Sequence, residues 1–198
     1  MLIIDVISDF RFEDGGRLLG PFGRAARNIA ALKRRAGVAG IPAIYVNDNF
    51  GRWRSDVRSL VAHCTHPSRP GAALVRLLAP TREDYFVLKP RHSAFYASAL
   101  EALLSFMGIR RLIITGVSSH QCVLFTANDA YVRQYEMKIP RDCIAAPEAR
   151  QTRFALRYFE MVLGADTRPS GKARYWRAPR QAKQRRSFAA LQGRTSQT

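Results

Sequence analysis

The fold of this chain is decided by residues 111–122, which read RLIITGVSSHQC. Residues 112–114 form an apolar run, which is typical of a strand buried on both faces of a sheet. Gly116 begins a turn, and the chain beyond it has the spacing of a helix from about His120 to Tyr135. A buried strand that passes through a tight turn into a helix is the repeating unit of α/β proteins.

The same alternation extends along the chain to about Asp166. Short aliphatic runs alternate with longer stretches of helical period, which predicts an α/β protein with a doubly wound, mainly parallel sheet. We expect strands at residues 2–6, 43–46, 85–88, 111–115 and 137–140. We expect helices at residues 22–39, 56–63, 72–78, 98–107, 120–135 and 147–163, with a glycine-rich loop at 14–16 before the first of them.

Length and composition favour a single domain over residues 1–170. A chain of 198 residues is large enough for one hydrophobic core and too short for a second full domain. No stretch approaches the roughly 20 apolar residues that cross a bilayer, and no secretory signal follows Met1, so we expect a cytoplasmic protein without membrane contact. Three cysteines at irregular spacing favour single thiols over a disulfide framework or a structural zinc site.

The formal net charge of +17 raises the question of an acidic partner. About half of it lies in residues 171–198, which contain no acidic residue and are predicted to form a basic, flexible C-terminal tail. Tyr175, Trp176 and Phe188 are interleaved with arginines there, a pattern that can stack on bases. Without a folded reader module, nucleic acid is the less favoured partner, and packing on a neighbouring subunit stays equally open.

Three chemically useful residues follow strand ends. Asp5 closes the first strand, Lys89 follows the third, and Cys122 lies in the first turn of the helix after the fourth. Ligand sites of doubly wound sheets lie at the carboxyl ends of the strands, so these side chains are expected to meet. A helix N-terminus and a nearby cation lower the pKa of a thiol, and a carboxylate can carry its proton to a leaving amine. Taken singly, each residue also has a structural interpretation; their coincidence at one edge favours a nucleophilic amidase.

Three segments resemble the isochorismatase-like cysteine hydrolases, which include nicotinamidases and N-carbamoylsarcosine amidases. They are LIIDVISDF at 2–10, LKPRHSAF at 88–95 and TGVSSHQCV at 115–123, and the resemblance runs from residue 2 to about 170. It implies a three-layer α/β/α fold of the Rossmann-like kind and a homo-oligomer.

The resemblance also implies a role for each residue of a catalytic triad. Asp5 would be the general base, Lys89 the cationic partner and Cys122 the nucleophile. A cis peptide would join Val117 to Ser118, and the N–H groups of Ser118 and Cys122 would form the oxyanion hole.

Departures from the family narrow the chemistry. Nicotinamidases of this family bind a metal through an Asp-x-His motif, but here Asp48 is followed by Asn49 and Phe50, so neither a metal nor another cofactor is expected. His63 and His66 could be ligands, although solvated histidines are the favoured interpretation. True isochorismatases lack the cysteine. The sequence therefore predicts a metal-independent cysteine hydrolase that cleaves an amide or ureide C–N bond of a small molecule through a covalent thioester intermediate.

Five residues on loops at the same sheet edge are candidates for substrate binding. They are Asn47, Phe50, Trp53, His92 and Phe95. For each aromatic residue, packing in the core is about as plausible as lining the pocket.

A second hypothesis comes from a different functional class. A catalytically silent member of the family could use the fold as a scaffold and bind RNA or another acidic partner through the basic tail. Salt-dependent RNA binding that is lost on deletion of residues 171–198 would support it.

Overall fold

The computed structural model describes residues 1–48 and 57–171. Its strands are β1 (Leu2–Ile4), β2 (Ile44–Asp48), β3 (Tyr85–Lys89), β4 (Arg111–Val117), β5 (Glu136–Lys138) and β6 (Ile144–Ala145). Its α-helices are α1 (Gly15–Val38), α2 (Val57–Thr65), α3 (Ala72–Leu77), α4 (Leu100–Phe106), α5 (Cys122–Val132) and α6 (Ala149–Met161), and a 3-10 turn spans Arg141–Cys143.

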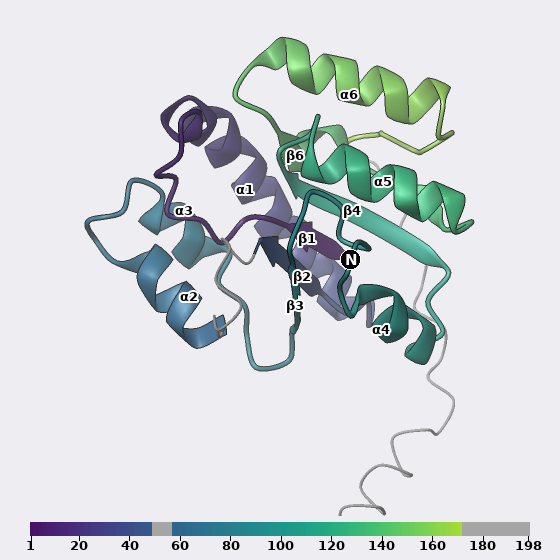
Figure 1. Cartoon of the computed structure of the whole chain (residues 1–198), viewed down its shortest axis with the longest axis horizontal. Helices are drawn as coiled ribbons and strands as arrows, with labels where there is room; N and C mark the ends of the chain where they lie inside the picture. The colour runs from purple at the N-terminus through teal and green to yellow at the C-terminus, as the bar shows by residue number, and fades with distance from the viewer. Residues whose placement is uncertain (49–56, 172–198) are drawn as a thin grey trace, which may run out of the picture.

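The strands form one parallel sheet in the order β3-β2-β1-β4-β5, with β6 paired to β4 beyond the carboxyl end of β5. Helices α1, α2 and α3 lie on one side of the sheet, and α4, α5 and α6 lie on the other (Figure 1). The predicted three-layer α/β/α fold is confirmed. The strand order reverses between β1 and β4, which is where doubly wound sheets place their ligand sites.

Two hydrophobic clusters fill the space between the layers because successive strand residues point to opposite faces. Ile3 of β1 packs in the cluster under α1, whereas Leu2 and Ile4 pack in the cluster under α4, α5 and α6. All three side chains are fully buried. The central strands are therefore held from both sides, which gives the residues at their carboxyl ends a rigid support.

The first helix begins earlier than predicted. Its first residue is Gly15, in the segment expected to be a loop, and Pro21 lies inside it. A Cβ at position 15 would lie 2.1 Å from the Phe10 carbonyl oxygen, so glycine is needed there for close packing. Proline removes one helical hydrogen bond, and burial of Leu18 and Phe22 outweighs that loss.

The two-residue strand β6 and the 3-10 turn before it were not predicted, because segments this short carry no periodicity. No helix in residues 1–48 and 57–171 is long and apolar enough to cross a membrane. The predicted tail lies, from residue 172 on, outside the described residues.

Candidate active site

The three strand-end residues meet at the switch point of the sheet. Asp5 directly follows β1, Lys89 is the last residue of β3, and Cys122 is the first residue of α5. Asp5 has a φ of 51°, in the left-handed region that few residues other than glycine occupy. Such backbone strain persists where the surrounding structure holds it, and it aims this side chain at the site.

Lys89 is the centre of this group. Its side chain is fully buried, and its Nζ lies 2.8 Å from Asp5 Oδ2 and 3.6 Å from Cys122 Sγ. The other oxygen of Asp5, Oδ1, accepts a hydrogen bond of 2.7 Å from the main-chain N–H of Asp48. One ammonium group therefore joins the carboxylate and the thiol that the sequence singled out.

Asp48 belongs to the same group, although the sequence reasoning considered it only as part of a metal motif. Its Oδ2 lies 3.8 Å from Lys89 Nζ, and it is the direct neighbour of Lys89 in the register of β2 and β3. The sequence could have indicated this role for Asp48, because it is an acidic residue at the end of the strand next to that of Lys89. Two carboxylates thus face one buried cation.

The resting state of the thiol differs from the prediction. Burial raises the pKa of Cys122 well above its ordinary value, the Asp5 carboxylate raises it further, and Lys89 only partly opposes them. Lys89 lowers this pKa as expected, but burial and Asp5 outweigh it, so the expected net lowering does not occur in the site without substrate. Cys122 rests as a neutral thiol.

The other two groups have pKa values that suit proton transfer. Burial raises the pKa of Asp5 above that of an ordinary aspartate, while Lys89 works against this rise. Burial works to lower the pKa of Lys89, but the negative charges of Asp5 and Asp48 raise it overall. The lysine stays protonated, and the aspartate is a stronger proton acceptor than an exposed carboxylate.

The turn between β4 and α5 has a cis peptide between Val117 and Ser118, as the resemblance implied. The Ser119 N–H donates to the Ala145 carbonyl (2.7 Å), and the Gln121 and Val123 N–H groups donate to the Ser118 carbonyl (3.0 and 3.2 Å). The N–H groups of Ser118 and Cys122 donate to no acceptor in the described parts of the chain. These two groups are available to a ligand oxygen.

His92 is a candidate pocket residue that lies beside the thiol. Its Nδ1 lies 3.6 Å from Cys122 Sγ, and its ring contacts that of Phe125 with the centroids 5.3 Å apart. The loop that carries it is tied to α5, because Ser93 Oγ donates to Asp129 and the Ala94 N–H donates to Thr126 Oγ1. The structure thus holds the imidazole beside the Cys122 thiol.

Two other candidates point into the protein. Asn47 is buried, and its amide both accepts from the Ile7 N–H (3.1 Å) and donates to the Ile7 carbonyl (2.9 Å). Phe95 is also buried and packs against Tyr135 and the Arg133 guanidinium. The prediction that these two side chains bind substrate does not fit their orientation, because backbone bracing and core packing already occupy them.

The remaining candidates, Phe50 and Trp53, lie outside the described residues.

The residues at the family's metal position do not fit a metal site. The carboxylate of Asp48 faces the Lys89 ammonium, and the described residues contain no group of three or more His, Cys, Asp or Glu side chains that could hold an ion. His63 Nε2 contacts Asp9 Oδ2 at 3.1 Å, and His66 Nδ1 contacts Ser68 Oγ at 2.8 Å. Each imidazole has its own local partner.

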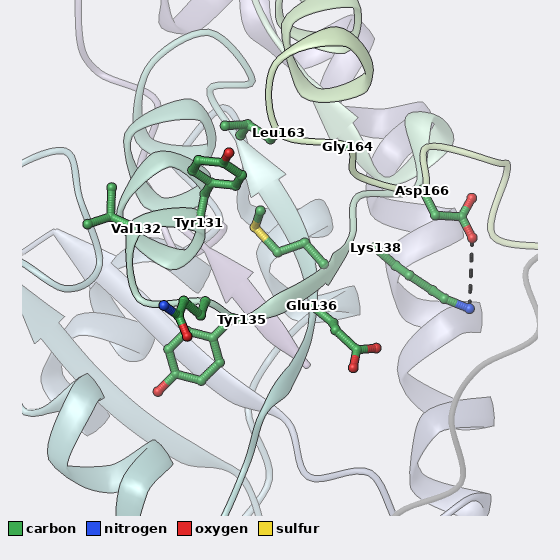
Figure 2. A pocket seen from close by; sticks show the side chains of 10 residues that line it. Tyr131, Val132, Tyr135, Glu136, Lys138, Leu163, Gly164 and Asp166 are labelled. Atoms are coloured by element: carbon green, nitrogen blue, oxygen red, sulfur yellow. Dashed lines mark ion pairs between the residues drawn. The ribbon is translucent and has the colours of Figure 1, made fainter.

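The cavity in Figure 2 is separate from the site formed by Asp5, Lys89 and Cys122. It has a volume of about 660 Å³ and lies at the carboxyl end of α5, whereas Cys122 begins that helix. Tyr131, Val132 and Tyr135 line it together with the Lys138–Asp166 ion pair of 3.8 Å (Figure 2). Asp5, Lys89 and Cys122 are not among its lining residues, so this cavity is not the pocket beside Cys122.

Comparison with known proteins identifies relatives over most of the chain. The Isochorismatase domain matches residues 1–167. The isochorismatase family protein YaaI of Bacillus subtilis is 41% identical over 166 residues, which are 84% of this chain and 91% of YaaI. The ureidoacrylate amidohydrolase RutB of Methylorubrum extorquens is 39% identical over 94 residues, which are 46% of this chain and 38% of RutB.

Solved structures show the same fold at lower identity. An isochorismatase from Pseudomonas putida has a TM-score of 0.70 at 22% identity, covering 87% of this chain and 88% of that one. N-carbamoylsarcosine amidase from Thermoplasma acidophilum has a TM-score of 0.67 at 21% identity, covering 88% and 97%. The domain match and the long alignment with YaaI lead to one conclusion: the chain belongs to the isochorismatase family.

Proposed function

We propose that this protein is a metal-independent cysteine hydrolase that cleaves a small amide or ureide at its C–N bond through a thioester on Cys122. The observation that carries the proposal is the position of Lys89 Nζ, 2.8 Å from Asp5 Oδ2 and 3.6 Å from Cys122 Sγ. The partial match to a ureidoacrylate amidohydrolase and the fold shared with an N-carbamoylsarcosine amidase agree with this bond type.

In the first half of the reaction, Asp5 takes the proton of the Cys122 thiol as sulfur attacks the carbonyl carbon. The C–S bond forms, and the carbonyl electrons move onto oxygen, where the N–H groups of Ser118 and Cys122 stabilise the negative charge. Asp5 then passes its proton to the nitrogen, the C–N bond breaks, and the amine leaves with a thioester remaining on the enzyme.

In the second half, Asp5 removes a proton from water, and the hydroxide oxygen attacks the thioester carbon. The C–S bond breaks, the sulfur regains the proton from Asp5, and the acid product leaves. Lys89 balances the negative charge that moves between the carboxylate and the sulfur, so neither has to exist as an isolated anion in a buried site. A thiol that rests neutral fits this cycle, because its proton is the one the leaving group needs.

The test is a screen of small amides, ureides and carbamoyl compounds, with the amine or ammonia released as the measured product. Cys122→Ser should reduce turnover by at least about a thousandfold, since it removes the nucleophile. An aldehyde or alkylating analogue of an active compound should add one mass increment to the wild-type protein and none to Cys122→Ala.

Cys64→Ala is the matched control, because Cys64 is a buried thiol outside the site. It should retain both turnover and labelling. Labelling of Cys122→Ala at the wild-type level would contradict the proposal, as would turnover that survives Cys122→Ser.

A further inference from the structure

A second cavity, of about 410 Å³, lies between α1, β6 and the beginning of α6. β6 runs between these two helices (Figure 1). Three arginines from three separate elements line the cavity: Arg24 from α1, Arg141 from the 3-10 turn and Arg153 from α6. The apolar part of its wall consists of Pro21, Ile144 and four small side chains, Ala25, Ala145, Ala146 and Ala149. The volume is within the range of small-molecule sites, and the alanines leave it open.

The charges around this cavity are not balanced by the acids beside it. Arg24 and Arg153 contact no carboxylate within the described parts of the chain, whereas Arg141 lies 3.6 Å from Glu160. Asp142 is the only acid among the lining residues, and its two oxygens accept hydrogen bonds of 2.7 and 2.8 Å from the N–H and Oγ of Ser170. Three guanidinium groups therefore line the cavity against one lining carboxylate, that of Asp142, and the side chains of Arg24 and Arg153 have no carboxylate partner within the described residues.

Two other arginines of the protein illustrate the pairing that Arg24 and Arg153 lack. Arg133 pairs with Glu101 at 2.9 Å, and Arg168 pairs with Asp166 at 2.7 Å. Arg24 and Arg153 are exposed side chains that line the same hollow, so an anion bound there can reach both guanidinium groups. Guanidinium groups bind phosphate oxygens in a bidentate manner, which suits an anion placed between Arg24 and Arg153.

We propose that this cavity binds a small molecule that carries a phosphate group, held between Arg24 and Arg153 with its remaining atoms against the alanine wall. The site is separate from the catalytic group and does not depend on the proposed hydrolase activity.

The wall of this cavity is bonded to the turn that precedes Cys122. The Ala145 carbonyl accepts a hydrogen bond of 2.7 Å from the Ser119 N–H, and Thr152 Oγ1 accepts one of 3.2 Å from Ser119 Oγ. Both Ala145 and Thr152 line the cavity. A ligand that holds α1, β6 and α6 together therefore also stabilises the hydrogen bonds of the fully buried Ser119, beside the candidate oxyanion N–H of Ser118.

Pyrophosphate is a suitable probe, and calorimetric titration measures its binding without any turnover assay. The test variant is Arg24→Ala with Arg153→Ala. The control is Arg27→Ala with Arg157→Ala, which removes the same charge from exposed positions on the same two helices that do not line the cavity. We expect the dissociation constant to rise at least tenfold in the test variant and less than twofold in the control. Binding should persist in Cys122→Ser and Lys89→Gln.

Equal weakening in both double variants would overturn the proposal, because it would indicate only a diffuse attraction to a basic surface. Failure of wild-type protein to bind pyrophosphate at millimolar concentration would overturn it as well. Hydrogen exchange locates the ligand: the amides of Ser119 and of residues 141–153 should exchange more slowly with pyrophosphate present, and only when both cavity arginines are present. Protection elsewhere in the chain would contradict the assignment.

Discussion

At the scale of single residues, the proposed use of a neutral thiol as the nucleophile depends on Lys89. A buried ammonium without a partner costs several kcal/mol, and here Asp5 and Asp48 supply the opposite charge. The same ammonium lies within 3.6 Å of the sulfur, so charge can pass from carboxylate to thiolate without leaving its field. The pKa values of both Asp5 and Cys122 therefore depend on this one lysine.

Replacing Lys89 with glutamine should shift the pH dependence of the site. Burial already raises the pKa of Asp5, and Lys89 is the main influence that lowers it. Without the lysine this pKa rises further, so Asp5 stays protonated and unable to act as a base up to a higher pH. The acid limb of the rate of Cys122 alkylation, and of kcat/KM once a substrate is found, should move to higher pH.

Lys33→Gln is the matched control for this measurement. Lys33 also forms an ion pair, with Asp84, but on the α1 side of the sheet and without contact to Cys122. Its replacement should leave the acid limb unchanged. An acid limb that stays in place in Lys89→Gln would show that Asp5 is not the group that titrates.

At the scale of elements, the turn after β4 depends on close contact with β1. Gly116 has a φ of +117°, and a Cβ there would lie 2.0 Å from the Ile4 carbonyl oxygen. The pairing of Ile4 with Gly116 brings the end of β1, and hence Asp5, next to the cis peptide and the helix that carries Cys122. The glycine is therefore a condition for assembling the site.

Gly116→Ala should destabilise the protein by roughly 3 kcal/mol or more, since the methyl group meets rigid backbone and the φ is unfavourable. Two other glycines serve as controls, because a Cβ at either meets nothing within 4 Å. Gly108→Ala, with a φ of +64°, should cost about 1 to 2 kcal/mol, and Gly37→Ala, inside α1, should stabilise by about 0.5 to 1 kcal/mol. Urea denaturation measures all three, and a neutral Gly116→Ala would refute the close contact.

At the scale of the whole molecule, hydrogen bonds attach Ser170, near the end of the described residues, to α1 and to the 3-10 turn. The Arg35 side chain donates to the Ser170 carbonyl (2.8 Å), and the Ser170 N–H donates to Asp142 (2.7 Å). The residues beyond this point carry about half of the net charge of +17. About half of the charge excess therefore lies outside the segment that these hydrogen bonds close, and the other half lies within it.

Deleting residues 172–198 should leave the melting temperature within about 2 °C of the wild type, because the hydrogen bonds of Ser170 remain. The deletion removes eight positive charges, so it should weaken binding to RNA and reduce the salt dependence of that binding. Labelling of Cys122 should persist at the wild-type rate. Labelling that disappears with the tail would contradict a catalytic site contained in residues 1–170.

Local pattern was enough to predict the class of fold, most of the helices and strands, and the identity of Asp5, Lys89 and Cys122. Residues 2–4 and 112–114 are apolar without interruption, and burial between two helix layers imposes that composition. In a parallel sheet the strand ends share one edge, so residues at those ends could be grouped without coordinates. The start of the first helix was predicted wrongly. Gly15 and Pro21 suggested a loop, but close packing of Gly15 against Phe10 permits a helix there.

Tertiary structure alone decided the states and orientations of these groups. Burial set the raised pKa of Cys122, the Ile7 backbone turned Asn47 inward, and α5 held His92 beside the sulfur. The arginine-lined cavity likewise exists only where α1, β6 and α6 meet. Periodicity reports which side of an element is buried, but a pKa, a rotamer or a cavity depends on atoms that lie far apart in the sequence. The amino-acid order therefore determined the kinds of groups at the site, and packing determined what each of them can do.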